Sequence, residues 1–168
     1  MTRKISELSP KEILALAIHI EQANKNRLRN FAHAFSGYDQ EVEGKFNELA
    51  EEEGFHEAWL QQKFEKMFKG PVPKVTEFDV EEVVEAVEWD DSEHQIFDSL
   101  KAENVYRLAL DAENGARNFY QVAIKTVKEK SLVKLFKELA GMENDHVEWL
   151  KKRIGVTGKK PKKNGEKP

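Results

Sequence analysis

Residues 46–60 of this 168-residue chain recur, 90 positions later, as residues 136–150. The two segments read FNELAEEEGFHEAWL and FKELAGMENDHVEWL, and eight of their fifteen positions are identical. A weaker match, at an offset of 92, pairs Glu21 with Glu113. Because a repeated sequence folds into a repeated structural unit, the chain is predicted to contain two similar halves that pack on each other.

Each half contains two long amphipathic segments. Four segments nearly free of glycine and proline carry apolar residues at i, i+3, i+4 and i+7, which indicates helices rather than strands. The expected helices span about residues 10–35, 39–69, 91–128 and 131–154. Between the second and the third, a looser segment contains a predicted short helix from about 79 to 89. The fold class is therefore all-α, an antiparallel four-helix bundle built from a duplicated helical hairpin with a short crossover helix.

Local signals place the ends of these helices. The run Ser9-Pro10-Lys11-Glu12 is a capping box with proline at the first helical position. Ser92 and Ser131 are expected to cap the third and fourth helices. Gly70 and Gly155 follow the second and fourth helices, where glycine commonly ends a helix.

Six ionisable side chains fall on the apolar faces of these helices. Residues three, four or seven positions apart share a helix face. Around Glu53 those positions hold apolar residues, Phe46 and Leu60 among them, so this carboxylate points toward the core. The same test predicts that one glutamate of each helix points inward, and two of these glutamates are followed three residues later by a histidine. The six inward residues are Glu21, Glu53, His56, Glu113, Glu143 and His146.

Four inward carboxylates need compensating positive charge. Burying one ionised carboxylate without a partner is unfavourable, and burying four together adds mutual repulsion. Two divalent cations balance the four charges, and neutral imidazoles complete the coordination. One glutamate from each of two helices, with Glu-x-x-His from each of the other two, is the ligand arrangement of di-iron and di-manganese bundles. The pattern predicts a dinuclear metal site, and the alternative is a metal-free core of buried Glu–His hydrogen bonds.

Three motifs make the chain resemble the ferritin-like superfamily, most closely its rubrerythrin-type proteins. Residues 112–120 look like the family's Glu-x-x-Ala-x-x-Phe-Tyr helix, and residues 49–56 and 139–146 both match Leu-Ala-x-x-Glu-x-x-His. The resemblance covers about residues 10–153. It implies that the six inward residues are ligands of two iron ions, with manganese or a mixed pair as alternatives that suit the same ligands.

The resemblance also implies redox chemistry. The leading hypothesis is a non-haem di-iron oxidoreductase that reduces H2O2 or O2. Its electrons would come from an external donor protein, because no Cys-rich rubredoxin domain follows the bundle. The alternatives are a ferroxidase that stores or handles iron, and a non-catalytic bundle stabilised by its metals. Hydroxylation of a substrate would require an apolar pocket beside the metals.

Two positions near the predicted ligands bear on activity. Tyr120, two helical turns after Glu113, is the candidate catalytic residue: it would donate a hydrogen bond to a ligand carboxylate or pass an electron, and the alternative is a core aromatic. Ala116 stands where a rubrerythrin typically offers a second glutamate.

The remaining candidates are expected to support the scaffold. Trp59 and Trp149, equivalent in the repeat, are predicted to pack between helices. Glu52 and Asp145 flank the ligands and either orient an imidazole or remain solvated charges. Three histidines are expected away from the site, on the surface or after a helix cap: His19, His33 and His94.

Composition limits the remaining function classes. The chain has no cysteine, which excludes disulfides, Cys-ligated zinc and thiol nucleophiles. Its longest apolar run, 13–18, is far shorter than a membrane span, and no signal peptide is recognisable, so a cytoplasmic location is expected. Residues 1–153 are predicted to form the metal-binding bundle and residues 154–168 a basic, flexible tail.

Charge is divided unevenly along the chain. Residues 151–168 hold eight of the 27 Lys/Arg and one of the 31 Asp/Glu, so residues 1–150 carry 19 basic against 30 acidic residues, a net charge of −11. An acidic body does not favour broad nucleic-acid binding, and a basic tail of this length is typical of a solubilising end. The expected partners are therefore H2O2 or O2, the electron donor and further copies of the chain, at least as a dimer.

Overall fold

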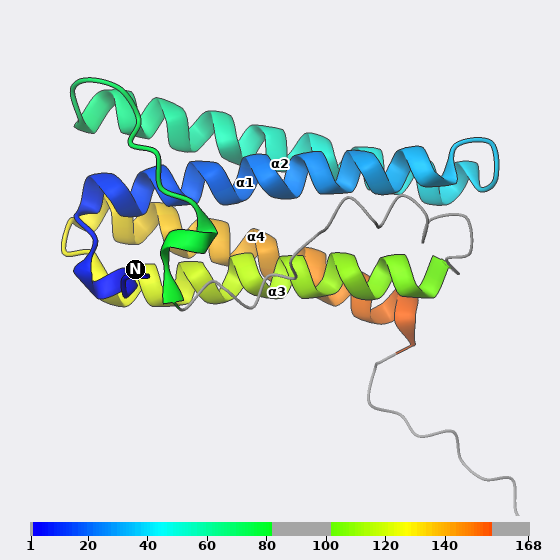
Figure 1. Cartoon of the computed structure of the whole chain (residues 1–168). Coiled ribbons are helices and arrows are strands. Elements are labelled where there is room, and N and C mark those ends of the chain that lie inside the picture. The colour runs from blue at the N-terminus through cyan, green and yellow to red at the C-terminus, as the bar shows by residue number, and fades with distance from the viewer. Residues whose placement is uncertain (1, 82–101, 156–168) are drawn as a thin grey trace, which may run out of the picture.

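The structure, a computed structural model, describes residues 2–81 and 102–155. Four long helices run nearly parallel or antiparallel to one another in two hairpins, one layered on the other (Figure 1). The helices are α1 (Pro10–Phe35), α2 (Gln40–Met67), α3 (Ala102–Thr126) and α4 (Lys130–Ile154). This arrangement confirms the predicted all-α four-helix bundle.

Most of the predicted helix ends match the structure. The Ser9 side chain accepts a hydrogen bond from the Glu12 amide, and the Glu12 carboxylate accepts one from the Ser9 amide at 2.9 Å, which completes the capping box. Gly70 and Gly155 adopt φ values of 82° and 74°, the left-handed region in which glycine is favoured.

The predicted cap of α4 is wrong. The helix begins at Lys130, and the capping position is Glu129, whose side chain makes no capping hydrogen bond. The amides of Leu132 and Val133 both donate to the Glu129 carbonyl, so the first turn has already formed when the chain reaches Ser131.

The crossover between the hairpins is only partly described. The described residues include two short 3-10 helices, η1 (Ile5–Glu7) and η2 (Glu77–Asp79). Arg3, which precedes η1, and Val80, which follows η2, form an isolated β-bridge. The short helix was predicted to begin at about residue 79. At that place the chain instead forms the single turn of η2. The rest of that predicted helix, the Ser92 cap and His94 lie outside the described residues.

The apolar core is divided into two clusters along the bundle axis. One contains Leu14, Phe64 and Phe136, and the other contains Phe31 and Phe46. Every long helix contributes residues to both clusters. Along each helix, the buried glutamate lies between the residues that belong to one cluster and those that belong to the other. The repeat therefore places the predicted site at the middle of the bundle, with an apolar cluster on either side.

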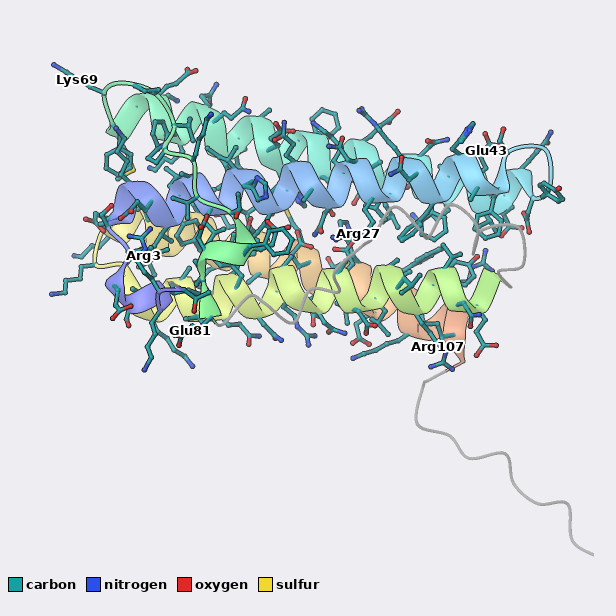
Figure 2. The ribbon with its side chains drawn as sticks, viewed as in Figure 1. Arg3, Arg27, Glu43, Lys69, Glu81 and Arg107 are labelled. Atoms are coloured by element: carbon teal, nitrogen blue, oxygen red, sulfur yellow. The ribbon has the colours of Figure 1, made fainter. Side chains whose placement is uncertain are left out.

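The outer surface of the bundle is polar. Lys69 and Arg107 are among the charged side chains that extend from it into solvent (Figure 2). None of the described helices contains an apolar stretch long enough to cross a membrane.

Candidate metal centre

The structure brings all six predicted site residues together. Each is at most 6% exposed, although all six are ionisable. Their ligand atoms form two groups of four, each with its atoms within 4.8 Å of one another. Glu53 and Glu143 belong to both groups. Glu21 and His56 complete the first half-site, and Glu113 and His146 complete the second.

The two shared glutamates lie between the two histidines. Glu53 presents Oε2 at 3.2 Å from Nδ1 of His56 and Oε1 at 3.0 Å from Nδ1 of His146. Glu143 likewise presents Oε1 at 3.3 Å from His56 and Oε2 at 3.8 Å from His146. Each shared carboxylate thus directs one oxygen to each half-site, as a carboxylate that bridges two ions does.

Glu21 and Glu113 each serve a single half-site. Oε2 of Glu21 lies 3.3 Å from Nδ1 of His56. Oε2 of Glu113 lies 3.5 Å from Nδ1 of His146. The donor set is therefore four carboxylates and two imidazoles, a hard set that suits iron and manganese.

Without metal, protons supply the compensating charge. Burial, together with the charges of Glu113 and Glu21, raises the pKa of Glu53 to about 8. Burial and the neighbouring carboxylates hold the pKa of Glu143 well above its usual range. Although burial alone would lower them, contacts with the carboxylates raise the pKa values of His56 and His146 to about 12. Cation binding would release these protons, as it does at other carboxylate and histidine sites.

Several buried polar atoms at the centre lack hydrogen bonds. They are Oε1 of Glu53, Oε2 of Glu113, both carboxylate oxygens of Glu143 and Nδ1 of His146. These atoms contact one another only as the close Glu–His pairs given above, and folded proteins rarely leave buried polar atoms without a well-formed hydrogen bond. Because these atoms face one another and are of the kind that bind cations, the site fits two metal ions better than it fits a metal-free core.

Comparison with known proteins agrees with this geometry. A family model described as rubrerythrin matches residues 12–154, and again residues 104–167. The chain belongs to the rubrerythrin family. A comparison with curated proteins finds no match.

Two solved structures resemble this rubrerythrin-family protein. An uncharacterized conserved protein from Magnetospirillum magnetotacticum MS-1 is 20% identical with a TM-score of 0.72, over 92% of this chain and 99% of the other. A hypothetical protein from Pyrococcus furiosus is 28% identical with a TM-score of 0.63, over 91% of this chain and 92% of the other. The first of these shows the shared fold alone.

Two hydrogen bonds support the site of this rubrerythrin-family protein from outside the ligand set. Nε2–H of His146 donates to Oε2 of Glu52 at 2.8 Å, which fixes the ring with Nδ1 facing the carboxylates. The hydroxyl of Tyr120, itself fully buried, donates to Oε1 of Glu21. The sequence left two roles open for each of these residues. In the structure, Glu52 makes the contact expected of a residue that orients an imidazole, and Tyr120 makes the contact expected of a hydrogen-bond donor to a ligand carboxylate.

The other candidate residues lie away from the carboxylates. His33 is exposed, and His19 is half-buried and paired with Glu77. Asp145 is exposed. Trp149 packs edge-on against Tyr106, as predicted.

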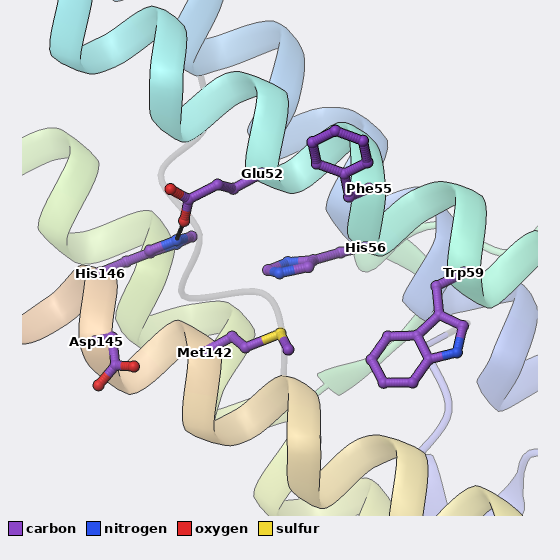
Figure 3. Close-up of a pocket in the computed structure, with 7 residues that line it drawn as sticks. All are labelled: Glu52, Phe55, His56, Trp59, Met142, Asp145 and His146. Atoms are coloured by element: carbon purple, nitrogen blue, oxygen red, sulfur yellow. Dashed lines mark hydrogen bonds and ion pairs between the residues drawn. The ribbon is translucent and has the colours of Figure 1, made fainter.

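The prediction for Trp59 is wrong. Its side chain is 38% exposed and lines a pocket between α2 and α4 instead of packing closed between helices. The pocket lies against His56 and His146, on the outer side of their rings (Figure 3). This pocket was not predicted from the sequence; the one signal for it is that two apolar residues, Phe55 and Met142, fall on the exposed sides of their helices.

Proposed function

We propose that this rubrerythrin-family protein is a non-haem di-iron oxidoreductase that reduces H2O2 or O2 with electrons from an external donor. The observation that carries the proposal is the pair of half-sites that share Glu53 and Glu143, one carboxylate oxygen of each directed to each histidine. The proposed ligands are Glu21, Glu53, His56, Glu113, Glu143 and His146. Manganese, or a mixed pair, suits the same donors.

Two bound Fe(II) ions would supply one electron each to an O–O bond. H2O2 then takes up two electrons and two protons and yields two molecules of water. The chain's own residues hold the site for this reaction. Glu52 orients His146, Tyr120 fixes one oxygen of Glu21, and the two apolar clusters limit the access of bulk water.

An anaerobic titration with Fe(II), followed by addition of H2O2, tests the proposal. We expect two irons per chain, one H2O2 consumed per pair of Fe(II) ions, both irons retained, and repeated turnover after reduction with dithionite. Iron handling predicts instead that Fe(II) is consumed beyond two per chain and that iron leaves the site as mineral. Two irons bound without any reaction with oxidant would leave only the non-catalytic metal bundle.

Substitution of a shared ligand locates the iron. Glu53→Ala and Glu143→Ala should bring bound iron well below two per chain. Glu51→Ala, an exposed glutamate two residues before Glu53 on the same helix, is the control and should keep both irons. Retention of two irons in both ligand variants would remove the site from this location.

A further inference from the structure

The pocket between α2 and α4 has apolar walls that are open to solvent. Its volume is about 320 Å³, within the range of small-molecule sites. Phe55, Trp59 and Met142 line it and are 72%, 38% and 40% exposed. They are three of the six large apolar side chains that are exposed among the described residues. Apolar surface concentrated in this way indicates a place that something covers.

Two metal-ligand candidates form the inner end of the pocket. The rings of His56 and His146 lie there, nearly parallel, with their centroids 6.0 Å apart (Figure 3). None of the four buried glutamates lines the pocket. A molecule in it therefore meets the outer edges of the imidazoles, and the rings separate it from the carboxylate side where the metals would lie. Electrons can pass across such a contact, whereas an oxygen atom cannot be transferred across it.

One of these two imidazoles has a hydrogen-bond donor available to the pocket. Nε2 of His146 is bonded to Glu52. Nδ1 of His56 faces the carboxylates, and its Nε2 makes no hydrogen bond with any residue that the structure describes, although the residue is only 6% exposed. In the repeat, the position of Glu52 corresponds to Met142, which offers a thioether in place of a carboxylate. The pocket thus combines apolar walls with a single N–H group from His56.

The charge at the edge of the pocket selects against anions. The Glu52 side chain is 44% exposed, and Asp145 is exposed beside it. Both are acidic, so an anionic molecule would be repelled. A neutral molecule with an aromatic ring and an oxygen acceptor matches the walls, the donor and the charge together.

We propose that this pocket binds a small, neutral aromatic diol, a hydroquinone, as an electron donor to the metal centre. One hydroxyl oxygen accepts the hydrogen bond from Nε2–H of His56, and the ring packs against Trp59, Phe55 and Met142. Electrons pass through the imidazole of His56. The inference rests on the proposed function, because it supplies the reductant which that reaction requires.

The reaction balances. A hydroquinone loses two electrons and two protons and becomes the quinone. H2O2 gains two electrons and two protons, its O–O bond breaks, and two water molecules form. No further reductant or oxidant is needed.

Binding is measured first, independently of turnover. The probe is 4-methylphenol, titrated by calorimetry into the oxidised iron-loaded protein. We expect one site per chain, with affinity lowered at least fivefold by Phe55→Ser and at least tenfold by Met142→Glu, which places a carboxylate beside Nε2 of His56. Tyr38→Ser removes an aromatic side chain that is 91% exposed at the distant α1–α2 turn and is the matched control, with affinity unchanged. Equal affinity in all four proteins would overturn the proposal.

The absorption spectrum tests the geometry. Because the imidazoles separate the pocket from the metals, bound 4-methylphenol should produce no phenolate-to-iron charge-transfer band. Such a band would show that the phenol reaches iron directly, and it would overturn the proposed position.

Turnover separates the two proposals. Hydroquinone and dithionite are compared as reductants with H2O2, and Phe55→Ser should lower hydroquinone-driven turnover at least fivefold more than dithionite-driven turnover. If dithionite-reduced protein reduces H2O2 but hydroquinone neither binds nor supports turnover, the inference fails and the proposed function stands. If dithionite-reduced protein does not react with H2O2 or O2, the proposed function fails, and with it the donor role of the pocket.

Discussion

The two half-sites have the same ligand types but different outer partners. In the half-site of Glu113 and His146, Glu52 accepts a hydrogen bond from the imidazole. In the half-site of Glu21 and His56, Tyr120 donates to the carboxylate instead, and Nε2 of the imidazole has no hydrogen-bond partner among the described residues.

The repeat shows how this asymmetry arose. At the offset of 90 the counterpart of Glu52 is Met142, and at the offset of 92 the counterpart of Tyr120 is Leu28. The repeat therefore preserves the ligands, and differences at two positions outside the ligand set make the half-sites unequal. A fixed imidazole favours tight metal binding in one half, and an open imidazole allows exchange with an outside molecule in the other.

The largest expected effect is a loss of iron binding, and it distinguishes the glutamates shared by both half-sites from those that belong to one half-site. Glu143→Ala removes an oxygen from each half-site and should weaken binding of both irons by about 100-fold or more, above the 10–100-fold typical of outer partners. Glu113→Ala affects only the second half-site and should leave one iron per chain. Anaerobic Fe(II) titration with iron analysis measures both. Equal loss in the two variants would mean that the half-sites are not divided as the distances indicate.

The second prediction exchanges the outer partners. Glu52→Met gives His146 the same neighbour type as His56, and it should lower the affinity of the tighter iron by roughly 10-fold to 100-fold, since an unsupported imidazole is a weaker and less fixed ligand. Met142→Glu should bring the weaker iron closer to the tighter one. Stepwise Fe(II) binding curves give the two affinities, with Glu51→Met as the control for loss of an exposed acid on α2.

These two predictions also show where sequence reasoning reached its limit. Helical periodicity predicted that all six site residues point inward, because their neighbours at three, four and seven positions are apolar. In the structure the six residues are buried and lie together, as expected. The sequence did not decide whether Glu52 orients an imidazole or remains a solvated charge. Its hydrogen bond with His146 joins α2 to α4 across 94 residues and depends on how the two hairpins pack. The pocket was missed for the same reason: it lies between two helices, which no single helix pattern encodes.

The third prediction concerns the metal-free protein. Glu53→Gln should stabilise it by about 1–3 kcal/mol near pH 8, because it removes a buried charge that repels Glu21 and Glu113. A carboxyl whose pKa rises from 4.5 unfolded to about 8 folded costs no stability below pH 4.5 and costs progressively more as the pH rises to 8. The raised histidine pKa values act in the same direction from pH 6.5 upward.

Thermal unfolding of the metal-free protein between pH 5 and pH 8 is the measurement. The wild-type midpoint should fall as the pH rises, and the fall should be shallower in Glu53→Gln. The same variant should bind iron more weakly, since a neutral amide replaces a shared carboxylate. A metal-free variant less stable than wild type at pH 8 would show that the carboxylates are already compensated without metal.

The smallest effect concerns the tyrosine that is present in only one half. Tyr120→Phe keeps the edge-on ring contact with Phe119 and the tilted contact with Phe136, and it removes only the hydroxyl that donates to Glu21. A buried carboxylate oxygen then loses its donor, so the free energy of unfolding of the metal-free protein should fall by about 1–3 kcal/mol.

Tyr106→Phe is the matched control for this change. Tyr106 also lies in α3 and contacts Phe46 and Trp149 through its ring, so loss of its hydroxyl should change stability by less than about 0.5 kcal/mol. If both variants lose the same stability, the Tyr120 hydroxyl contributes no more than an ordinary phenol. The asymmetry between the half-sites would then rest on Glu52 and Met142 alone.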